Sequence, residues 1–344
     1  MFTATLQKLV VHYIGSKNNL EPCHYSTELV TLKEEHQEAL EQGLLQRFKN
    51  NFEYYAFTHP SSLQFNEVFN YCKSIFEDQD NFAEAAEKIG HHLYEHSVHP
   101  RIKGGELYVA LFDALPVESR MHQAIGIFKT EHKSFFLDVQ HRKQQISLQL
   151  KEGVELSKID KGCLVINRKE DQGFDVLLFD SQNRGEEAQY WKDKFLSLIP
   201  QQNEYHHTNQ VLTLTKQFIT QELAAEDSFS HTEKAELLNK SIDYFKSKDS
   251  FNIEEFQQEV FANDEIIESF KTFGSRFVEN TNFDIAAQFD ISNEAVRKQS
   301  RIFKSVLKLD RNFHIYIHGR TDLIERGVDT DGRKYYKIYY QEEA

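Results

Sequence analysis

The chain has 344 residues, of which 40% are hydrophobic and 13% aromatic, so it can build packed cores and is not expected to be disordered. Its apolar runs are far shorter than the ~20 residues that span a bilayer, and Lys8 and His12 interrupt the apolar N-terminus where a signal peptide would be uniform. We therefore expect a cytoplasmic protein of two domains whose cysteines, Cys23, Cys72 and Cys163, form neither a disulfide framework nor a CxxC metal site.

The net charge of −14 opposes nucleic-acid binding, because Lys and Arg are the residues that neutralise phosphates and release their counterions. The charge is unevenly distributed along the chain. Residues 291–344 carry 11 Lys and Arg against 8 Asp and Glu, a balance of +3, which leaves −17 for residues 1–290. A polyanion is therefore expected to bind at the C-terminal end.

The first half of the chain shows strand and helix patterns in turn. Phe2, Ala4 and Leu6 alternate with polar residues and lead into Leu9–Val11, which predicts a strand. Apolar residues three and four positions apart predict helices over Glu28–Phe48, Phe65–Phe76 and Phe82–His96. Further strands are predicted over Glu106–Leu115, Met121–Lys129, Phe135–Gln140 and Ile146–Leu150, and then a hairpin of Cys163–Asn167 with Phe174–Asp180. We expect residues 1–185 to form a mostly antiparallel sheet with helices packed on one face.

Past Gly185 the pattern becomes helical. Helices are predicted over Gln189–Leu198, Asn209–Ala225, Thr232–Lys246, Ile253–Phe261 and Glu265–Phe273. Strands return at Phe313–His318 and Tyr335–Tyr340, where Asp331-Gly332 has the turn chemistry of a hairpin. We expect residues 186–344 to form a helical domain with a C-terminal basic helix and a small β-hairpin region, which makes the whole chain α+β.

The segment Ser292–Leu309 carries the sharpest charge pattern. Ser292 or Asn293 can cap a helix in which four cations, Arg297, Arg301, Lys304 and Lys308, recur at steps of four, three and four and lie within roughly 60° of one another. Such a helix could dock by its apolar side and offer cations to phosphates. Two other interpretations stay open: a solvated face balanced by acidic neighbours, or a strand over Ser305–Leu309 that ends the helix near Arg301 and removes the last two cations from the stripe.

The overlapping segment Asp284–Gln299 has the outline of a helix-turn-helix, with apolar residues at the expected offsets. Asp290 stands where a glycine would ease the turn, so an ordinary helical hairpin is the alternative that we favour.

No catalytic or metal-binding pattern is evident. His92 and His96 are one helical turn apart and His91 and His99 lie nearby, but the HExxH order is absent and no Cys or Asp completes a ligand set, which favours a solvated or hydrogen-bonded helix end. GxSxG, Walker and GxGxxG motifs are absent, and Lys103-Gly104-Gly105 precedes a strand, which predicts a turn. We expect no enzymatic activity, cofactor or metal; a metal-dependent hydrolase is the interpretation with least support.

Several segments resemble the bacterial nucleoid-associated proteins of the NdpA/YejK type. They are IKGGELYVALFDAL (Ile102–Leu115), the hairpin of CLVINR and FDVLLFD, YWKDKFLSLI (Tyr190–Ile199) and AVRKQSRIFKSVLKLDRNFHIYIHG (Ala295–Gly319). The resemblance covers nearly the whole chain in order and contains no catalytic signature. It implies association with double-stranded DNA in the bacterial nucleoid and contact with chromosome-handling proteins such as type II topoisomerases.

The charge pattern and the resemblance together predict a dimeric nucleoid-associated protein that binds double-stranded DNA through phosphate contacts, with little base selectivity. The predicted contact residues are Arg297, Arg301, Lys304, Lys308 and Arg311, with Lys298, Arg320 and Lys334 as outer candidates. The alternative is an acidic protein-interaction module that modulates a DNA-handling enzyme, such as a type II topoisomerase, and touches DNA weakly or not at all.

Overall fold

A computed structural model of the chain describes residues 3–142, 145–181, 190–223, 229, 231–281, 285–301, 303, 305–309, 313–317 and 323–342. The chain divides into two compact units, residues 1–201 and 202–344. The sequence placed the boundary between the domains after residue 185. The first unit extends past that point, to residue 201. Within the described ranges no helix is both long and apolar enough to cross a membrane.

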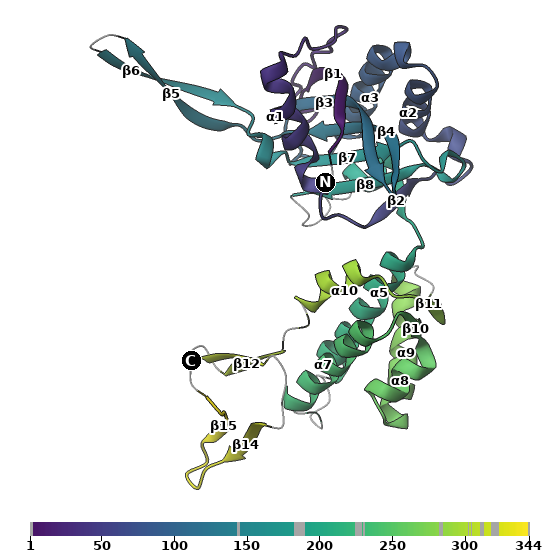
Figure 1. Cartoon of the computed structure of the whole chain (residues 1–344), viewed down its shortest axis with the longest axis vertical. Helices are drawn as coiled ribbons and strands as arrows, with labels where there is room; N and C mark the ends of the chain where they lie inside the picture. Colours follow the sequence, from purple (N-terminus) through teal and green to yellow (C-terminus); the bar gives the residue numbers. More distant parts are fainter. Residues whose placement is uncertain are drawn as a thin grey trace. The chain divides into compact units, whose positions relative to one another are not determined.

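The first unit is built on a seven-stranded antiparallel sheet with the order β1-β3-β4-β7-β8-β2-β9 (Figure 1). Its strands are β1 (Thr5–Ile14), β2 (Tyr54–Phe57), β3 (Gly105–Val117), β4 (Arg120–Lys129), β7 (Lys161–Ile166), β8 (Asp175–Asp180) and β9 (Leu198–Pro200). The predicted strands of this sheet and the β7–β8 hairpin are confirmed. The short strands β2 and β9 were not predicted.

Helices cover both faces of this sheet, whereas the sequence led us to expect one. Successive side chains of a strand point to opposite faces, so Val109 and Leu111 of β3 join one buried cluster and Ala110 and Phe112 join the other. The helices α2 (Glu67–Glu77) and α3 (Phe82–His96) and the π-helix η6 (Tyr190–Leu196) pack in the first cluster, and α1 (Glu34–Leu45) packs in the second. Both sheet faces are apolar, and both therefore need a cover.

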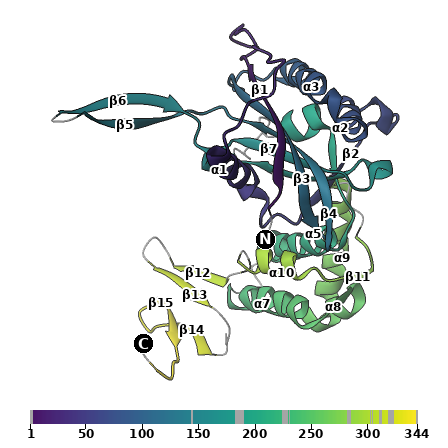
Figure 2. The same cartoon turned by 45° about the horizontal axis from the view of Figure 1, so that its top comes forward.

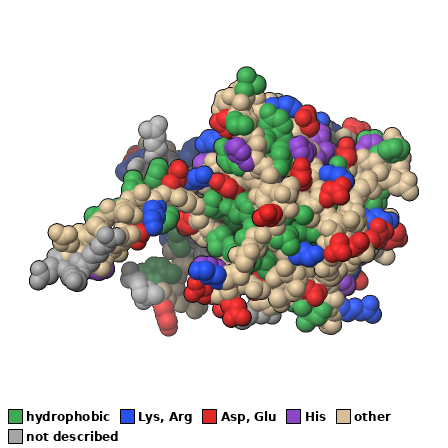
Figure 3. Space-filling view, turned by 90° about the horizontal axis from the view of Figure 1, so that it is seen from above, with side chains coloured by type: hydrophobic (Ala, Val, Ile, Leu, Met, Phe, Trp, Pro, Cys, Tyr) green, Lys and Arg blue, Asp and Glu red, His purple; other side chains and the backbone are tan. Residues whose placement is uncertain are grey.

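A two-stranded arm leaves the first unit between β4 and β7. It consists of β5 (Ser134–Arg142) and β6 (Gln145–Gly153), which pair only with each other among the described strands and extend away from the body in both cartoon views (Figures 1 and 2). Hydrophobic side chains are visible along it in the space-filling view (Figure 3). The two strands were predicted. We expected them in the main sheet, but they form a separate two-stranded sheet.

The second unit is mostly helical and is filled by aromatic side chains. Its helices are α5 (Glu204–Gln217), the π-helix η7 (Phe218–Glu222), α7 (His231–Ser247), α8 (Ile253–Val260), α9 (Asp264–Thr281) and α10 (Asn293–Ser300). Rings of Phe218, Phe256, Phe261 and Phe270 contact one another in the core, with centroids 4.9 to 6.3 Å apart. The short strands β10 (Ser250–Asn252) and β11 (Gln288–Asp290) pair at one edge of the unit.

The chain closes with two small antiparallel pairs. The strand β12 (Ser305–Leu309) pairs with β13 (Phe313–Ile317), and β14 (Ile324–Val328) pairs with β15 (Lys334–Ile338). The predicted turn at Asp331-Gly332 is confirmed, since Gly332 has a φ of +84° and its amide donates to the Asp329 carbonyl.

Candidate nucleic-acid interface

The helix α10 carries the first of the predicted DNA contacts, and its start is fixed by hydrogen bonds. Of the two predicted caps, Ser292 and Asn293, Ser292 is the N-cap: its hydroxyl accepts a bond from the Ala295 amide at 3.3 Å. Its own amide donates to the Thr208 hydroxyl of α5 at 3.0 Å, in a buried position. The first turn of α10 is therefore tied to α5 by the backbone as well as by packing.

The inner face of α10 consists of Ala295, Val296 and Gln299, all buried. The side-chain amide of Gln299 donates to the Asn209 side-chain oxygen and, at 3.4 Å, to the Thr213 hydroxyl, and both acceptors lie on α5. A buried amide is stable only when its polar atoms find such partners. These contacts leave the opposite side of α10 facing solvent.

The outer face of α10 presents Arg297, Lys298 and, just beyond its last turn, Arg301, all exposed. Arg297 and Arg301 lie four positions apart and thus on one side of the helical turn. In the part of the chain that the structure describes, no carboxylate forms an ion pair with either guanidinium. Lys298 donates to the Tyr205 hydroxyl at 3.0 Å and lies 5.6 Å from the centre of its ring, which holds this ammonium beside α5.

The predicted continuous basic helix from Ser292 to Leu309 is wrong, because α10 ends at Ser300 and Ser305–Leu309 is the strand β12. The strand alternative raised by the sequence is the one that is confirmed. Val306, Leu307 and Leu309 supply the β-branched and apolar side chains that favour a strand once Phe313–Ile317 is available to pair with it. The backbone of Lys308 lies in β12 opposite His314, and Lys304 lies outside the described residues.

The helix-turn-helix suggested by Asp284–Gln299 is also wrong, and so is the ordinary helical hairpin that we favoured over it. Gln288–Asp290 forms β11 and pairs with β10, so the segment before α10 is extended where a first helix was required. Phe289 stacks on Phe251 of β10, with ring centroids 4.7 Å apart, and the extended backbone brings this ring into contact with the core. A groove-reading helix pair is therefore not formed by these residues.

The remaining predicted cations lie in the C-terminal strands or outside the description. Arg311 and Arg320 lie outside the described residues. Lys334 is exposed at the first position of β15, opposite Val328. The structure therefore brings Arg297, Lys298 and Arg301 together, and places Lys334 on a separate hairpin of the same unit.

The β14–β15 hairpin exposes tyrosines that the sequence analysis did not consider. Tyr335, Tyr339 and Tyr340 are all more than two-fifths exposed, and Lys337 lies 4.9 Å from the centre of the Tyr339 ring. Two lysines and four tyrosines lie close together in KYYKIYY (Lys334–Tyr340), which was the available signal for this surface. Exposed aromatic rings beside cations are typical of surfaces on which the unpaired bases of single strands stack.

A network of buried charges lies where the arm leaves the sheet of the first unit. The Lys129 ammonium lies 3.0 Å from the Glu131 carboxylate, and Lys161 lies 3.0 Å from Asp180. The Tyr190 hydroxyl donates to Glu131 at 3.1 Å. Burial lowers the pKa of Lys129, while Glu131 acts against that shift, and burial beside Glu131 raises the pKa of Tyr190. Local sequence patterns do not reveal this network, because its members come from the ends of β4, β7 and β8 and from η6.

The same region fastens the first residues of the arm. A carboxylate oxygen of Asp160 accepts bonds from the amides of Glu131 at 2.6 Å and of His132 at 3.2 Å. Lys133 pairs with Glu106 of β3 at 2.8 Å. The arm is therefore anchored on the body immediately before its first strand.

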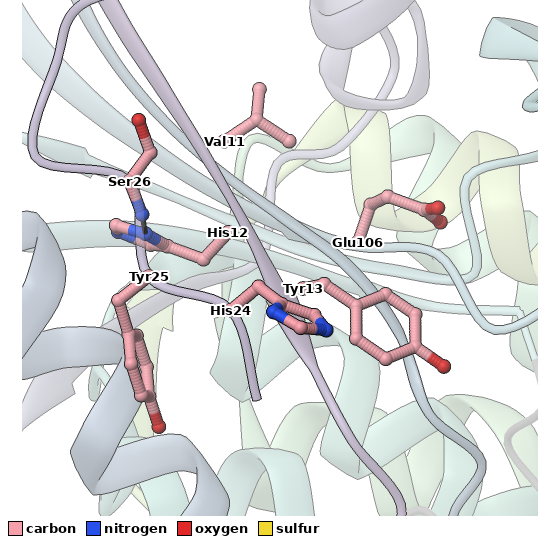
Figure 4. Close-up of a pocket in the computed structure, with 7 residues that line it drawn as sticks. All are labelled: Val11, His12, Tyr13, His24, Tyr25, Ser26 and Glu106. Carbon is pink, nitrogen blue, oxygen red and sulfur yellow. Dashed lines mark hydrogen bonds between the residues drawn. The ribbon is translucent and has the colours of Figure 1, made fainter. Parts of the chain in front are cut away.

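A shallow depression of about 330 Å³ beside β1 is a second place where a ligand could be considered (Figure 4). His12 accepts a bond from the Ser26 amide at 3.0 Å, and burial lowers the pKa of His12, so this imidazole is neutral near pH 7. Glu106 is already paired with Lys133, and Tyr13 lies 3.5 Å from Glu21. The depression offers no pair of nucleophile and base.

The histidine cluster of α3 is held by contacts within the protein. His92 bonds to the Phe195 carbonyl at 3.1 Å, and its ring lies 4.4 Å from that of His96, while His91 stacks on Tyr25. Over the described ranges, no group of three or more His, Cys, Asp or Glu side chains is placed to hold a metal ion.

Comparison with known families identifies one match. The family described as "Nucleoid-associated protein YejK" matches residues 10–332, which is most of the chain and spans both units. A search of curated proteins found no match.

Proposed function

Because the chain belongs to the nucleoid-associated protein YejK family, which is not an enzyme family, we propose that it binds double-stranded DNA through phosphate contacts made by its second unit. The observation that carries this proposal is the outer face of α10, where Arg297 and Arg301 are exposed without an ion pair among the described residues. Their backbone is held by the buried contacts of Ser292 and Gln299.

The proposed mechanism is electrostatic. Arginines and lysines that neutralise about four phosphates per chain release the corresponding counterions, which gives a slope of about −4 in a plot of log affinity against log salt. Arg297, Lys298, Arg301 and Lys334 are the described residues that would make these contacts. Phosphate contacts carry no base information, so little sequence selectivity is expected.

The acidic remainder of the chain limits where DNA can lie. Residues 1–290 carry −17, and Asp and Glu side chains are spread over the face seen in Figure 3. Repulsion from this surface opposes coating of the protein by DNA and favours one oriented contact. The proposal includes a homodimer, in which two such contacts act on one duplex, so the salt slopes apply per chain and add for the dimer.

The test is a titration of labelled duplex DNA at several salt concentrations with the wild-type chain and the variant Arg297→Glu/Arg301→Glu. Loss of two cations and gain of two anions should weaken binding at low salt by at least about thirtyfold and flatten the salt slope by about 2. The matched control is Lys240→Glu/Lys246→Glu, which changes the net charge equally at exposed lysines of α7 that pair with Glu236 and Asp243. Equal affinity of both variants would remove α10 from the interface.

A second candidate function is an acidic module that modulates a DNA-handling enzyme such as a type II topoisomerase. The observation that favours it is the charge of −17 on residues 1–290, which suits a basic partner surface. This candidate predicts no DNA binding even at low salt, together with a change in the supercoil relaxation rate when the chain is added to the enzyme.

A further inference from the structure

The β5–β6 arm has one apolar face and one polar face. Residues directly opposite each other in the pair share a face, so the register Phe135↔Glu152, Leu137↔Leu150, Val139↔Leu148 and His141↔Ile146 defines one side. Six of these eight side chains are large and apolar. We call this set the arm stripe: Phe135, Leu137, Val139, Ile146, Leu148 and Leu150.

The opposite face of the arm is polar and satisfied within the arm. Asp138 lies there with Gln149, and its carboxylate accepts bonds from Lys151 at 2.6 Å and from Gln140 at 3.2 Å. Phe136 is the apolar side chain of this face, and it lies near the base beside Gly153. The division into two faces is therefore a property of the whole arm.

The arm stripe has no cover within the chain described. Its side chains are between 47% (Val139) and 69% (Phe135) exposed. An isolated two-stranded hairpin is at best marginally stable in water, and a contiguous exposed apolar patch of this kind marks an interaction site. Something outside the first unit should cover it.

The composition of the arm disfavours DNA as that cover. Residues 134–153 carry three Lys and Arg and two Asp and Glu, a balance of +1. Phosphate recognition needs a cluster of cations, whereas six apolar side chains gain free energy only when another apolar surface removes them from water. The partner is therefore a protein surface.

A second copy of the chain fits the stripe in charge. On the stripe face Glu152 lies at the base of the arm and His141 lies toward its tip. If two arms pack face to face in opposite directions, stripe covers stripe, and the His141 imidazole near the tip of each arm meets the Glu152 carboxylate of the second copy, which can accept a hydrogen bond from it. A two-fold axis makes both contacts at once.

Area and electrostatics support the same partner. Six such side chains bury on the order of 500 Å² per copy, and standard interfaces bury about 800 Å² per partner, so other contacts along the arms need to add about 300 Å². Each nine-residue strand is roughly 30 Å long, which exceeds the screening length of about 8 Å in physiological salt. Pairing through the arms thus keeps two acidic bodies apart.

We propose that the arm stripe is the dimer interface of this protein and packs antiparallel against the stripe of a second copy. The inference specifies the homodimer included in the proposed function, but it does not depend on DNA contact, and α10 is not part of it. The oligomeric state of the chain in the absence of DNA tests it.

The first test compares two variants on the same strand by sedimentation velocity of the full chain at about 1 to 100 µM. Leu148→Lys/Leu150→Lys places charges in the stripe, and Ser147→Lys/Gln149→Lys places the same charges on the polar face. The stripe variant should dissociate at least about a hundredfold more readily, while the control remains dimeric like the wild type. Fluorescence of Trp191, buried in the first unit, checks that both variants are folded.

A wild-type chain that is monomeric at the highest concentration would overturn the proposal and assign the stripe to a different protein. Equal dimerisation of both variants would overturn it as well. Neither result bears on the DNA titration with the α10 variants, so the two proposals fail separately.

The second test fixes the direction of the arms by a cross-link between cysteines, in a background in which the partly exposed Cys23 is replaced by Ser. Faces of packed sheets lie about 10 Å apart, which is too far for a disulfide between facing positions but suits a bis-maleimide with a spacer of about 10 Å. In the variant His141→Cys/Glu152→Cys the two positions of one arm are about 20 Å apart, too far for this spacer within one chain. The reagent should therefore produce a covalent dimer, and His141→Cys alone should not. A covalent dimer from the single variant would overturn the antiparallel arrangement.

Discussion

The arm and the helix α10 both present residues to solvent, but in opposite ways. The inner face of α10 is buried through Val296 and Gln299, and its outer face is charged. The arm has a polar face that satisfies itself through Asp138 and Lys151, and an apolar face that is left uncovered. Exposed cations are well hydrated and remain free to bind a polyanion. An exposed apolar stripe gains free energy only when another surface covers it. This difference indicates DNA as the partner of α10 and a protein surface as the partner of the arm.

The contacts that fasten the two elements also differ: a buried ion pair lies at the root of the arm, and neutral hydrogen bonds hold α10. The largest expected loss of stability comes from breaking the ion pair at the root of the arm. Lys129→Met leaves Glu131 buried without its ammonium partner, which should lower the free energy of unfolding of the first unit by about 3 to 5 kcal/mol. Urea unfolding followed by Trp191 fluorescence measures this, because Trp191 is the chain's single tryptophan and lies in that unit's core. The control Lys151→Met breaks an exposed ion pair and should change the free energy by less than about 1 kcal/mol. Similar losses in the two variants would mean that the buried pair does not stabilise the root of the arm.

The second prediction concerns pH and the support of α10. Burial lowers the pKa of His206 on α5 from 6.5 to about 4, so the unfolded chain takes up this proton before the folded chain does. Stability of the second unit contributed by this group is complete above pH 6.5 and is lost as the pH falls toward 4, by about 2 kcal/mol between pH 7.5 and pH 5.

Circular dichroism follows the helices of both units in urea at the two pH values, and Trp191 fluorescence reports the unfolding of the first unit separately. His206→Gln removes the titration and should reduce the pH dependence by that amount, while Trp191 fluorescence of the first unit responds equally in both proteins. An unchanged pH dependence in the variant would show that His206 does not contribute.

A smaller effect is expected at the neutral anchor of α10. Gln299→Leu removes the bonds to Asn209 and Thr213 and leaves their buried polar atoms less satisfied, which should lower the free energy of unfolding of the second unit by about 1 to 2 kcal/mol. The contrast with Lys129→Met tests whether the arm depends on charge where α10 depends on neutral hydrogen bonds. A greater loss of unfolding free energy in Gln299→Leu than in Lys129→Met would show that the buried ion pair is not the stronger of the two contacts.

The smallest effect is expected at the C-terminal hairpin. If the DNA contact continues from α10 to β15, Lys334→Ala removes one phosphate contact and should reduce the salt slope by about 0.9 with only a modest loss of affinity. Lys246→Ala, an exposed lysine of α7, is the control. A slope that is the same in Lys334→Ala and in the wild type would restrict the interface to α10.

The sequence predicted the repetitive parts of the fold well. The predicted helix Phe82–His96 coincides with α3, and the main strands of the sheet were also predicted. Both succeed because the spacing of apolar residues in an amphipathic helix or a half-buried strand can be recognised from neighbouring residues alone. The strands β2 and β9 have few residues and pair with partners distant in the chain. The alternation within β5 and β6 was equally clear, but it is the same whether the apolar face meets a helix or water.

The candidate interface was predicted in part for the same reason. The cap at Ser292 and the cations on the outer face of α10 follow from neighbouring residues. The end of the helix at Ser300 follows from the pairing of β12 with β13, a contact between segments, and the bonds of Gln299 to α5 cross about 90 positions of sequence. Helical spacing alone could not reveal either.

The ion pair between Asp138 and Lys151 has a consequence for the fidelity of assembly. Asp138 faces Gln149 directly, so its bond to Lys151 is diagonal and ties the two strands at a fixed offset. A hairpin in which one strand slipped by one residue would turn that strand's apolar side chains to the opposite side and divide the stripe between the two faces. This diagonal bond therefore contributes up to about 1 kcal/mol in favour of the register that keeps all six apolar side chains on one side, where a closed pair can cover them.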